Sequence, residues 1–267
     1  MDLLALDFMR KALLAGAFVG LAAPSVGIFL VQRRLSLMGD GIGHVVFMGV
    51  AAGLVLGVSP IATGLLFATA GAIAIELLRQ RGKASSDVAL ALIFYLGIAG
   101  GVFFLGFGST STLQLTSYLF GSVLTVNVTD LAILAVVAVA TTSVVMVLRK
   151  HFFAIAYDEE IARVAGLPVT ALNLSIAVMA AMTVAVTAKV VGVLLVSALL
   201  VVPVAAVQQV AHSFKATFFG GLAIGVFATT TGLVIAFYTD QFPAATIVLL
   251  SIALFVVASG VGLVRRG

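Results

Sequence analysis

The chain has 267 residues, of which 63% are hydrophobic and 9% charged, and its mean hydropathy is +1.30. A soluble domain is about 45–50% apolar and about 25% charged. This excess of apolar side chains excludes a soluble globular domain and a nucleic-acid-binding protein, because lipid must be the solvent over most of the outer surface. The chain has no cysteine, which excludes disulfides and thiolate metal sites.

The uncharged runs predict about nine transmembrane helices, since about 20 mostly apolar residues cross the hydrocarbon of a bilayer. The run 41–75 is too long for one crossing, and Val58-Ser59-Pro60 divides it into two spans. Residues 108–127 are rich in Ser, Thr and Gly, which indicates a non-cytoplasmic loop with a short amphipathic or re-entrant piece near 113–124. The other predicted spans are 12–31, 88–107, 131–148, 171–187, 190–207, 216–237 and 243–264.

Together the spans predict a single all-α domain over residues 1–267, a polytopic membrane helix bundle. Many Gly and Ala residues lie inside the spans, where they allow helices to approach closely. The apolar runs are continuous rather than alternating, which disfavours a transmembrane β-barrel. Pro24 and Pro203 lie inside predicted spans and are expected to kink them.

The positions of Lys and Arg predict the orientation of the bundle. With nine spans the loops alternate, and of the 14 basic residues eleven fall on one side and three on the other. The positive-inside rule places the larger group in the cytoplasm, which puts the N-terminus outside and the C-terminus inside. The smaller group is Arg10, Lys11 and Lys189. Topology therefore accounts for the formal charge of +4 without an acidic partner.

The longest polar stretch, 149–170, contains a predicted short helix at about 157–167. Asp158 is placed to cap its start, because an aspartate side chain accepts hydrogen bonds from the exposed amides of the first turn. Glu159 follows in that turn, where the helix dipole favours an anion. Gly166 suits the C-terminal cap, which often needs a left-handed conformation.

This short helix has an apolar face formed by Ile161, Val164 and Ala165. A helix of two turns is not stable alone in water, so it must dock either on its own bundle or on a cytoplasmic partner. The chain has no nucleotide-binding motif of its own, since Gly82-Lys83 lacks the surroundings of a P-loop. We therefore expect no enzyme activity in this chain, and any ATPase that drives it must be a separate polypeptide.

Asp40 and His44 are the sharpest pair of ionisable residues near an apolar stretch. They are four residues apart, so a helix places both side chains on one face. A carboxylate oxygen and an imidazole nitrogen suit Zn²⁺, Mn²⁺ or Fe²⁺, and two ligands fit a transient station on a pathway better than a storage site. The alternative, which the spacing alone favours, is that Asp40 caps the second span and His44 is a satisfied polar residue between helices.

The remaining ionisable residues are expected to be structural. Glu76 and Arg79 predict an exposed or snorkelling ion pair at the membrane interface. We also expect a helix cap at Asp87, solvated side chains in outer turns at Lys189 and Asp240, and surface histidines in cytoplasmic loops at His151 and His212.

Four stretches occur in order along nearly the whole chain: 32–44 (QRRLSLMGDGIGH), 118–122 (YLFGS), 158–167 (DEEIARVAGL) and 190–203 (VVGVLLVSALLVVP). Together they resemble the motifs of the membrane permease subunits of zinc/manganese/iron ABC importers. The chain departs from that pattern at Gly43, where the family usually has Ser, and at Phe47-Met48, where it usually has Leu-Pro.

The resemblance implies a homodimeric permease in the plasma (inner) membrane of a prokaryote, served by a separate ATP-binding subunit and by an extracytoplasmic metal-binding protein. It implies that Asp40 and His44 contact the transported ion, with zinc as the first choice and manganese or iron as alternatives, and that no cofactor is bound permanently. The residues that it implies couple to the ATPase are Asp158, Glu159, Ile161, Ala162, Val164, Ala165 and Gly166.

Three other functions are weighed against this one. A secondary transporter driven by an ion gradient would need intramembrane acids for coupling, and the spans hold almost none beyond Asp40 and His44. A membrane anchor without transport activity would assemble with an ATPase and move no metal. An intramembrane enzyme has the least support, because no paired acids and no nucleophile–base arrangement occur in the spans.

Overall fold

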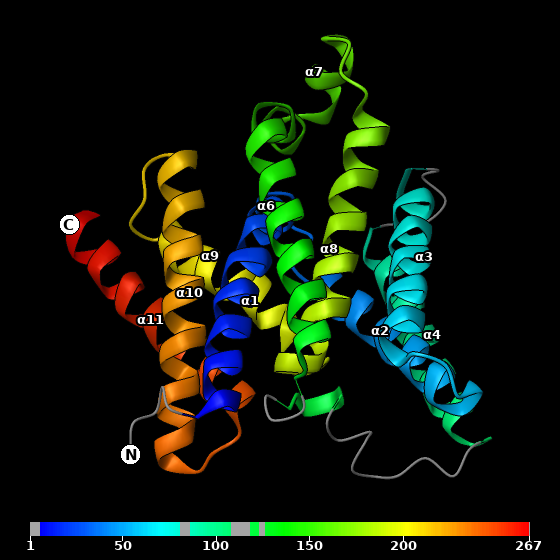
Figure 1. Ribbon diagram of the computed structural model, residues 1–267. Helices are drawn as coiled ribbons and strands as arrows, with labels where there is room; N and C mark the ends of the chain where they lie inside the picture. Colours follow the sequence, from blue (N-terminus) through cyan, green and yellow to red (C-terminus); the bar gives the residue numbers. More distant parts are fainter. Residues whose placement is uncertain (1–5, 81–85, 108–117, 123–125, 267) are drawn as a thin grey trace.

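The computed structural model describes residues 6–80, 86–107, 118–122 and 126–266, and the regular secondary structure in these ranges is entirely helical (Figure 1). The expected all-α membrane bundle is thereby confirmed. The helices are α1 (Asp7–Gln32), α2 (Met38–Leu56), α3 (Pro60–Gln80), α4 (Ser86–Leu105), α6 (Val128–Tyr157), α7 (Glu159–Val164), α8 (Val169–Val191), α9 (Val196–Gln208), α10 (Phe214–Thr239) and α11 (Pro243–Arg266).

Eight of the described helices are long and apolar enough to cross a membrane. The apolar segments contain 18 to 30 residues, which at about 1.5 Å per residue matches the thickness of the hydrocarbon layer. The prediction of about nine spans is thus close in number. The predicted loop at 108–127 lies largely outside the described residues.

One predicted span, 190–207, is wrong as a continuous helix. Helix α8 ends at Val191, the backbone turns at Gly192 with φ of +88°, and α9 begins only at Val196. The resulting α9 has 13 residues, too few to cross a bilayer alone. Hydropathy does not detect this interruption, because the residues at the break are themselves apolar.

Helix α6 is longer than the predicted span 131–148, because residues 149–157 contain no Gly or Pro that would end it. It continues through His151 to Tyr157. The expectation that His151 lies in a loop is therefore wrong, although its side chain is exposed as expected. Pro24 and Pro203 lie inside α1 and α9, as predicted.

Helix α1 lies in the middle of the bundle and packs against α6, α8, α9 and α10 (Figure 1). Small residues permit this, since a Cβ on Gly20 would lie 2.6 Å from the backbone of Gly225 in α10. A Cβ on Gly27 would overlap the backbone carbonyl of Leu200 in α9. Helices α1 and α9 therefore touch through their main chains at Gly27 and Leu200.

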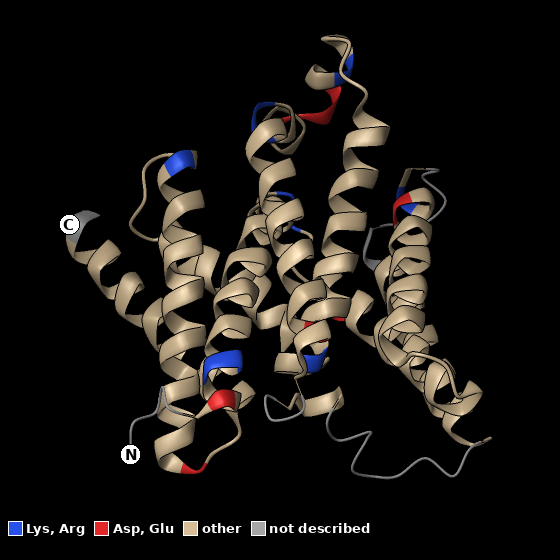
Figure 2. Cartoon of the chain, in the orientation of Figure 1, with Lys and Arg blue, Asp and Glu red and all other residues tan. Residues whose placement is uncertain are grey.

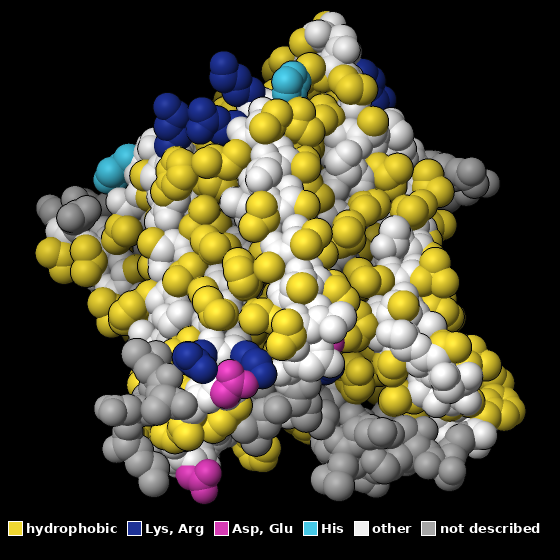
Figure 3. Space-filling model, viewed as in Figure 1, with side chains coloured by type: hydrophobic (Ala, Val, Ile, Leu, Met, Phe, Trp, Pro, Cys, Tyr) yellow, Lys and Arg dark blue, Asp and Glu magenta, His cyan; other side chains and the backbone are white. Residues whose placement is uncertain are grey.

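Charged residues gather at the two ends of the helices, and the apolar middle carries few (Figure 2). The end that carries α7 shows most of the Lys and Arg residues (Figure 2). Arg10 and Lys11 lie near the start of α1 and Lys189 lies in the last turn of α8, and both of these helix ends are at the opposite end of the bundle (Figure 1). Hydrophobic side chains cover the middle of the face in Figure 3. This banded surface is what a bundle needs in order to sit in a bilayer with its ends in water.

The contact of Gly27 with Leu200 predicts a severe effect of adding one methyl group. Gly27→Ala should lower the apparent melting temperature in detergent and cost more than the about 1–3 kcal/mol typical of overpacking, because the obstacle is backbone. The matched control is Gly260→Ala in α11, where a Cβ meets no atom within 4 Å. Equal melting temperatures for the two variants would contradict the close α1–α9 contact.

Candidate functional site

Asp40 lies in the first turn of α2, and its half-buried side chain faces α9. The hydroxyl of Ser197, near the start of α9, donates a hydrogen bond to Oδ1 of Asp40. The N-cap residue of α2 is Leu37, which makes no side-chain capping bond. The alternative in which Asp40 caps this helix is therefore wrong, and its carboxylate is engaged between helices instead.

His44 lies one turn further along α2, half-buried and on the same face as Asp40. Its ring packs edge-to-face on Phe94 of α4, with 4.4 Å between the ring centroids. Helix α4 reaches this close because of Gly97, where a Cβ would lie 2.5 Å from the His44 backbone. The imidazole is therefore oriented by a neighbouring helix rather than left mobile.

Gly43, where the family usually has Ser, lies between the two candidate ligands. A Cβ at this position would lie 3.2 Å from the carbonyl oxygen of Val193, which is tighter than an ordinary contact. Gly39, one turn earlier, packs in the same way against Ser197 and Leu200. These glycines let α2 lie against the α8–α9 junction, which brings Ser197 within reach of Asp40.

Asp40 and His44 form a pair rather than a larger group of candidate metal ligands. Within the described ranges, no group of three or more His, Asp and Glu side chains is placed to hold a metal ion. A carboxylate and an imidazole supply two ligands, and water or further groups must complete the shell of four to six.

Ser197 is a member of the site that reasoning from the sequence missed. The available signal was a hydroxyl inside an otherwise apolar run, residues 190–203. Since Ser and Thr are common in membrane helices, where they bond to the preceding turn, this signal alone does not single out Ser197.

The short helix predicted at about 157–167 is confirmed as α7, which has six residues. The carboxylate of Asp158 accepts hydrogen bonds from the amides of Glu160 and Ile161 at 2.8 and 2.9 Å, so it is the predicted N-cap. Gly166 follows the helix with φ of +80°, as its predicted role in the C-terminal cap requires.

The apolar face of α7 points away from the bundle, contrary to docking on its own bundle. Ile161 is 63% exposed and Val164 is 90% exposed, whereas Ala162 is buried. Tyr157, at the end of α6, is also exposed. Exposed apolar side chains on a two-turn helix at the polar end of a membrane protein are typical of a surface that meets a protein partner.

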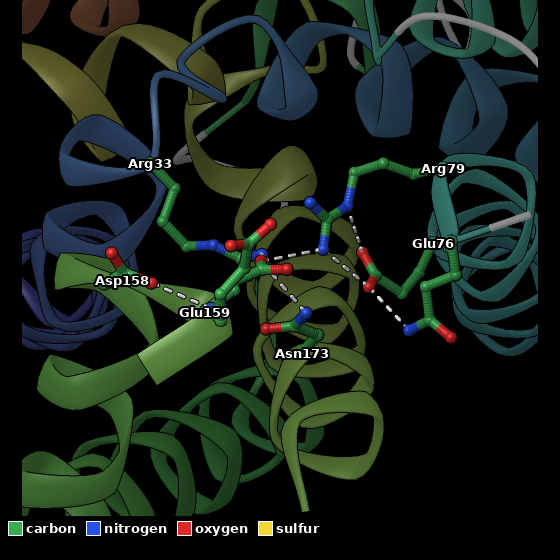
Figure 4. Close-up of polar contacts among 8 residues, drawn as sticks. Arg33, Glu76, Arg79, Asp158, Glu159 and Asn173 are labelled. Atoms are coloured by element: carbon green, nitrogen blue, oxygen red, sulfur yellow. Dashed lines mark hydrogen bonds and ion pairs between the residues drawn. The ribbon is translucent and has the colours of Figure 1, made fainter. Parts of the chain in front are cut away.

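A partly buried ion-pair cluster lies beside the start of α7 (Figure 4). The carboxylate of Glu159 receives hydrogen bonds from Arg33 just after α1, from Arg79 of α3 at 3.1 Å and from Asn173 of α8 at 3.1 Å. Arg79 also forms a bidentate pair with Glu76 at 2.9 and 3.0 Å. Four separate parts of the chain meet at this point.

The predicted Glu76–Arg79 pair is confirmed, but its predicted exposure is wrong. The Glu76 side chain is 2% exposed, and Gln80 donates a further hydrogen bond to it at 2.8 Å. Spacing along one helix could not reveal that Arg33 and Glu159, from distant parts of the chain, close over this pair.

The charge states of the cluster follow from burial and from the neighbouring charges. Burial of Glu159 by itself raises its pKa, but the guanidinium groups of Arg33 and then Arg79 outweigh this and hold the pKa below its usual value. Burial lowers the pKa of Arg33, but the ordinary pKa of an arginine is so high that the side chain stays charged. Glu159 is therefore an anion throughout the physiological pH range.

At the opposite end of the bundle, Lys189 is partly buried, and the prediction that it is solvated is wrong. Its ammonium group pairs with Asp130 at the start of α6, with side-chain exposures of 18% and 11%. Asp130 also forms a capping box with Asn127. Asp240 and His212 are exposed, as expected, and the side chain of Asp87 lies outside the described residues.

The membrane-spanning bundle, its charged ends and its exposed polar-end helix define a polytopic membrane protein with a surface for a partner. The chain belongs to the ABC 3 transport family, whose model matches residues 5–262. This confirms the family to which the four stretches pointed.

The chain is similar to a probable metal transport system membrane protein of Treponema pallidum, with 30% identity over 97% of each chain. It is also similar to the manganese transport system membrane protein MntC of Listeria innocua, with 28% identity over 94% of this chain and 89% of the relative. Other relatives carry names that specify iron or zinc.

Among solved structures, the fold is similar to that of PsaBC from Streptococcus pneumoniae in complex with Fab. The TM-score is 0.86, the identity is 29%, and the match covers 96% of this chain and 92% of that chain.

The capping role of Asp158 predicts a local effect on α7. Asp158→Ala should cost about 1 kcal/mol and raise hydrogen exchange at the amides of Glu160 and Ile161 about fivefold, because both lose their acceptor. Mass spectrometry of exchanged peptides measures this change. The control is Glu160→Ala on the same short helix, and faster exchange in the control alone would contradict the assignment.

Proposed function

We propose that this chain is the permease subunit of an ABC importer for a divalent transition metal ion, and that Asp40 and His44 contact the ion on its way through the membrane. The observation that carries the proposal is the pairing of a carboxylate and an imidazole on one face of an apolar helix. Ser197 and Phe94 orient the two groups from neighbouring helices. The names of three relatives specify manganese, iron and zinc. Each of these metals forms a divalent cation that carboxylate and imidazole ligands bind.

The mechanism that we propose is alternating access around this pair. A partial site binds the arriving ion briefly, and a change in helix positions then exposes the ion to the other side of the membrane. The hydrogen bond from Ser197 holds the Asp40 carboxylate toward the α8–α9 junction while the site is empty. An incoming cation competes with that hydroxyl for the same oxygen, so binding and the α2–α9 contact are linked.

The partners of the proposed permease follow from its two ends. A separate ATP-binding subunit docks on the exposed apolar face of α7, where Ile161 and Val164 supply the contact. An extracytoplasmic binding protein delivers the ion at the end that holds Lys189 and Asp130. The permease works as a homodimer in the inner membrane of a prokaryote, with its N-terminus outside, as the excess of basic residues at the α7 end supports.

Removing either candidate ligand should abolish uptake. In cells carrying the complete transporter, Asp40→Asn and His44→Gln should each reduce metal uptake by at least about tenfold, because one of two protein ligands is lost. The matched controls are Asp240→Asn and His212→Gln, which change exposed residues at the ends of the bundle. Co-purification of the ATP-binding subunit checks that each variant still assembles, and normal uptake in both ligand variants would reject the site.

Zinc is the first choice for the transported ion, and the ligand types alone also suit manganese and iron. Uptake of Zn²⁺, Mn²⁺ and Fe²⁺ should be measured separately and in competition, with the metal content of the cells as the readout. We expect the wild-type transporter to accumulate zinc in preference to the other two ions, and Asp40→Asn to remove that accumulation. Preferential accumulation of manganese or iron would identify that ion, instead of zinc, as the substrate, and would be consistent with the proposed site. Uptake that persists without ATP hydrolysis would instead favour a secondary transporter.

A further inference from the structure

Among the described residues, the polar contact that holds α7 to the bundle is made by the carboxylate of Glu159. The apolar side chains Ile161 and Val164 face away from the bundle, and among the apolar residues of α7 only Ala162 is buried. A single oxygen, Oε1 of Glu159, accepts hydrogen bonds from Arg33, Arg79 and Asn173 (Figure 4). These donors belong to the end of α1, to α3 and to α8, so one atom links α7 to three helices.

Arg33 connects this point to the start of α2 through a stiff corner. The amides of Arg34 and Leu35 donate to the carbonyls of Val31 and Leu30 at 3.1 and 2.8 Å, which is the Schellman pattern of a helix end. Arg34 adopts φ of +58°, so the backbone of this corner is tightly specified. The Arg33 side chain, which is 5% exposed, is therefore joined to the short segment before Asp40 by a well-defined backbone turn.

Asn173 connects the same carboxylate to the other side of the candidate site. It lies near the start of α8, and the far end of α8 breaks at Gly192 and leads directly to Ser197. Ser197 is the donor to Asp40. Glu159 thus contacts Arg33, which precedes the helix of Asp40, and Asn173, which lies in the helix that precedes Ser197.

The charges of the cluster balance only while Glu159 is ionised. Arg33 and Arg79 supply two positive charges, and Glu76 and Glu159 supply two negative charges. Arg79 has Glu76 as a second partner, whereas Arg33 forms its ion pair with Glu159. Loss of the Glu159 charge leaves the buried Arg33 without its carboxylate, which a low-dielectric environment penalises strongly.

The cluster also has room to rearrange. A cavity of about 310 Å³ adjoins the carboxylate and is lined by Arg79, Gln80, Glu159, Arg163, Thr170 and Asn173, among others. The buried Oδ1 of Asn173 finds no hydrogen-bond partner among the residues that the structure describes. The donors of the cluster therefore have open space and a further acceptor oxygen beside the carboxylate.

From these contacts we infer that Glu159 is a positioning residue that carries movement of α7 to the Asp40–Ser197 contact, an inference that rests on the proposed docking of an ATP-binding subunit on α7. Movement of α7 pulls on Arg33 and Asn173 together, because both donate to the same oxygen. The two segments that flank the proposed metal site then move relative to each other. This gives one ion-pair contact the task of linking ATP hydrolysis to metal passage.

The test compares metal transport with ATP hydrolysis in the complete transporter reconstituted in lipid vesicles. Glu159→Gln keeps the size and an acceptor oxygen but removes the charge. We expect ATP hydrolysis to remain within about twofold of wild type and metal uptake per ATP to fall about tenfold or more, since coupling energies typically correspond to about 5–150-fold. The control is Glu160→Gln, the neighbouring exposed glutamate, for which both rates should be unchanged. An unchanged uptake per ATP in Glu159→Gln overturns the inference and leaves the proposed function intact, whereas a wild-type complex that hydrolyses ATP and moves no metal rejects the proposed function itself.

A double-variant cycle with Arg33→Gln separates coupling from general damage. If the Arg33–Glu159 contact transmits the movement, each single variant and the double variant should lose uptake per ATP to a similar extent. Losses that multiply to about a hundredfold in the double variant would show independent effects and overturn the inference. If the Glu159→Gln transporter fails to assemble, Glu159→Asp is tested instead, because aspartate keeps the charge on a side chain that is one methylene shorter. Lowered uptake per ATP in that variant supports the inference, and an unchanged value overturns it.

Discussion

Where two apolar helices are separated by a break, the backbone must find new partners, and the break between α8 and α9 determines where the candidate site lies. The amides of Val193 and Leu194 donate to the carbonyls of Tyr118 and Leu119 at 3.0 and 3.3 Å. Gly121 and Gly192 have φ of +75° and +88° and lie back to back, so a Cβ on either would be 2.5 Å from a backbone atom of the other segment. Because these partners exist, α9 can begin at a level where Ser197 meets Asp40.

The same requirement for partners explains where the buried charges occur. Lys189, just before the break, pairs with Asp130 at one end of the bundle, and Glu159 pairs with Arg33 and Arg79 at the other. An ion pair that loses one member leaves a charge in a poorly solvated place, so such pairs hold the geometry of both ends strongly. Between them, Asp40 stands apart, because its described partner is a hydroxyl rather than a cation. A carboxylate held by a neutral group keeps its charge unpaired, as the proposed role of Asp40 in metal passage requires.

Most of the fold followed from the sequence, because hydropathy and span length report directly on membrane crossing. The N-cap at Asp158 and the C-terminal Gly166 were likewise predictable, since capping depends on residues a few positions apart. The break at Gly192 was not, because its signal is a partner segment about 70 residues away rather than a polar residue in the span. The pairing of Arg33 with Glu159 joins residues 126 positions apart, and only the packing of the helices brings them together.

The size of α7 explains why a charged group, and not an apolar one, holds it. A helix of six residues has room for one apolar face. In α7 this face is formed by Ile161 and Val164 and is exposed. If this face packed on the bundle, it would not be available to a partner. If it bound the partner and α7 had no other anchor, movement of α7 would not reach the rest of the bundle. The carboxylate of Glu159, on the other side of the helix, resolves this conflict, because one oxygen reaches three helices without using the apolar face. Such an anchor leaves the exposed apolar face of α7 free. It also ties α7 to the two segments that lead to Asp40 and to Ser197.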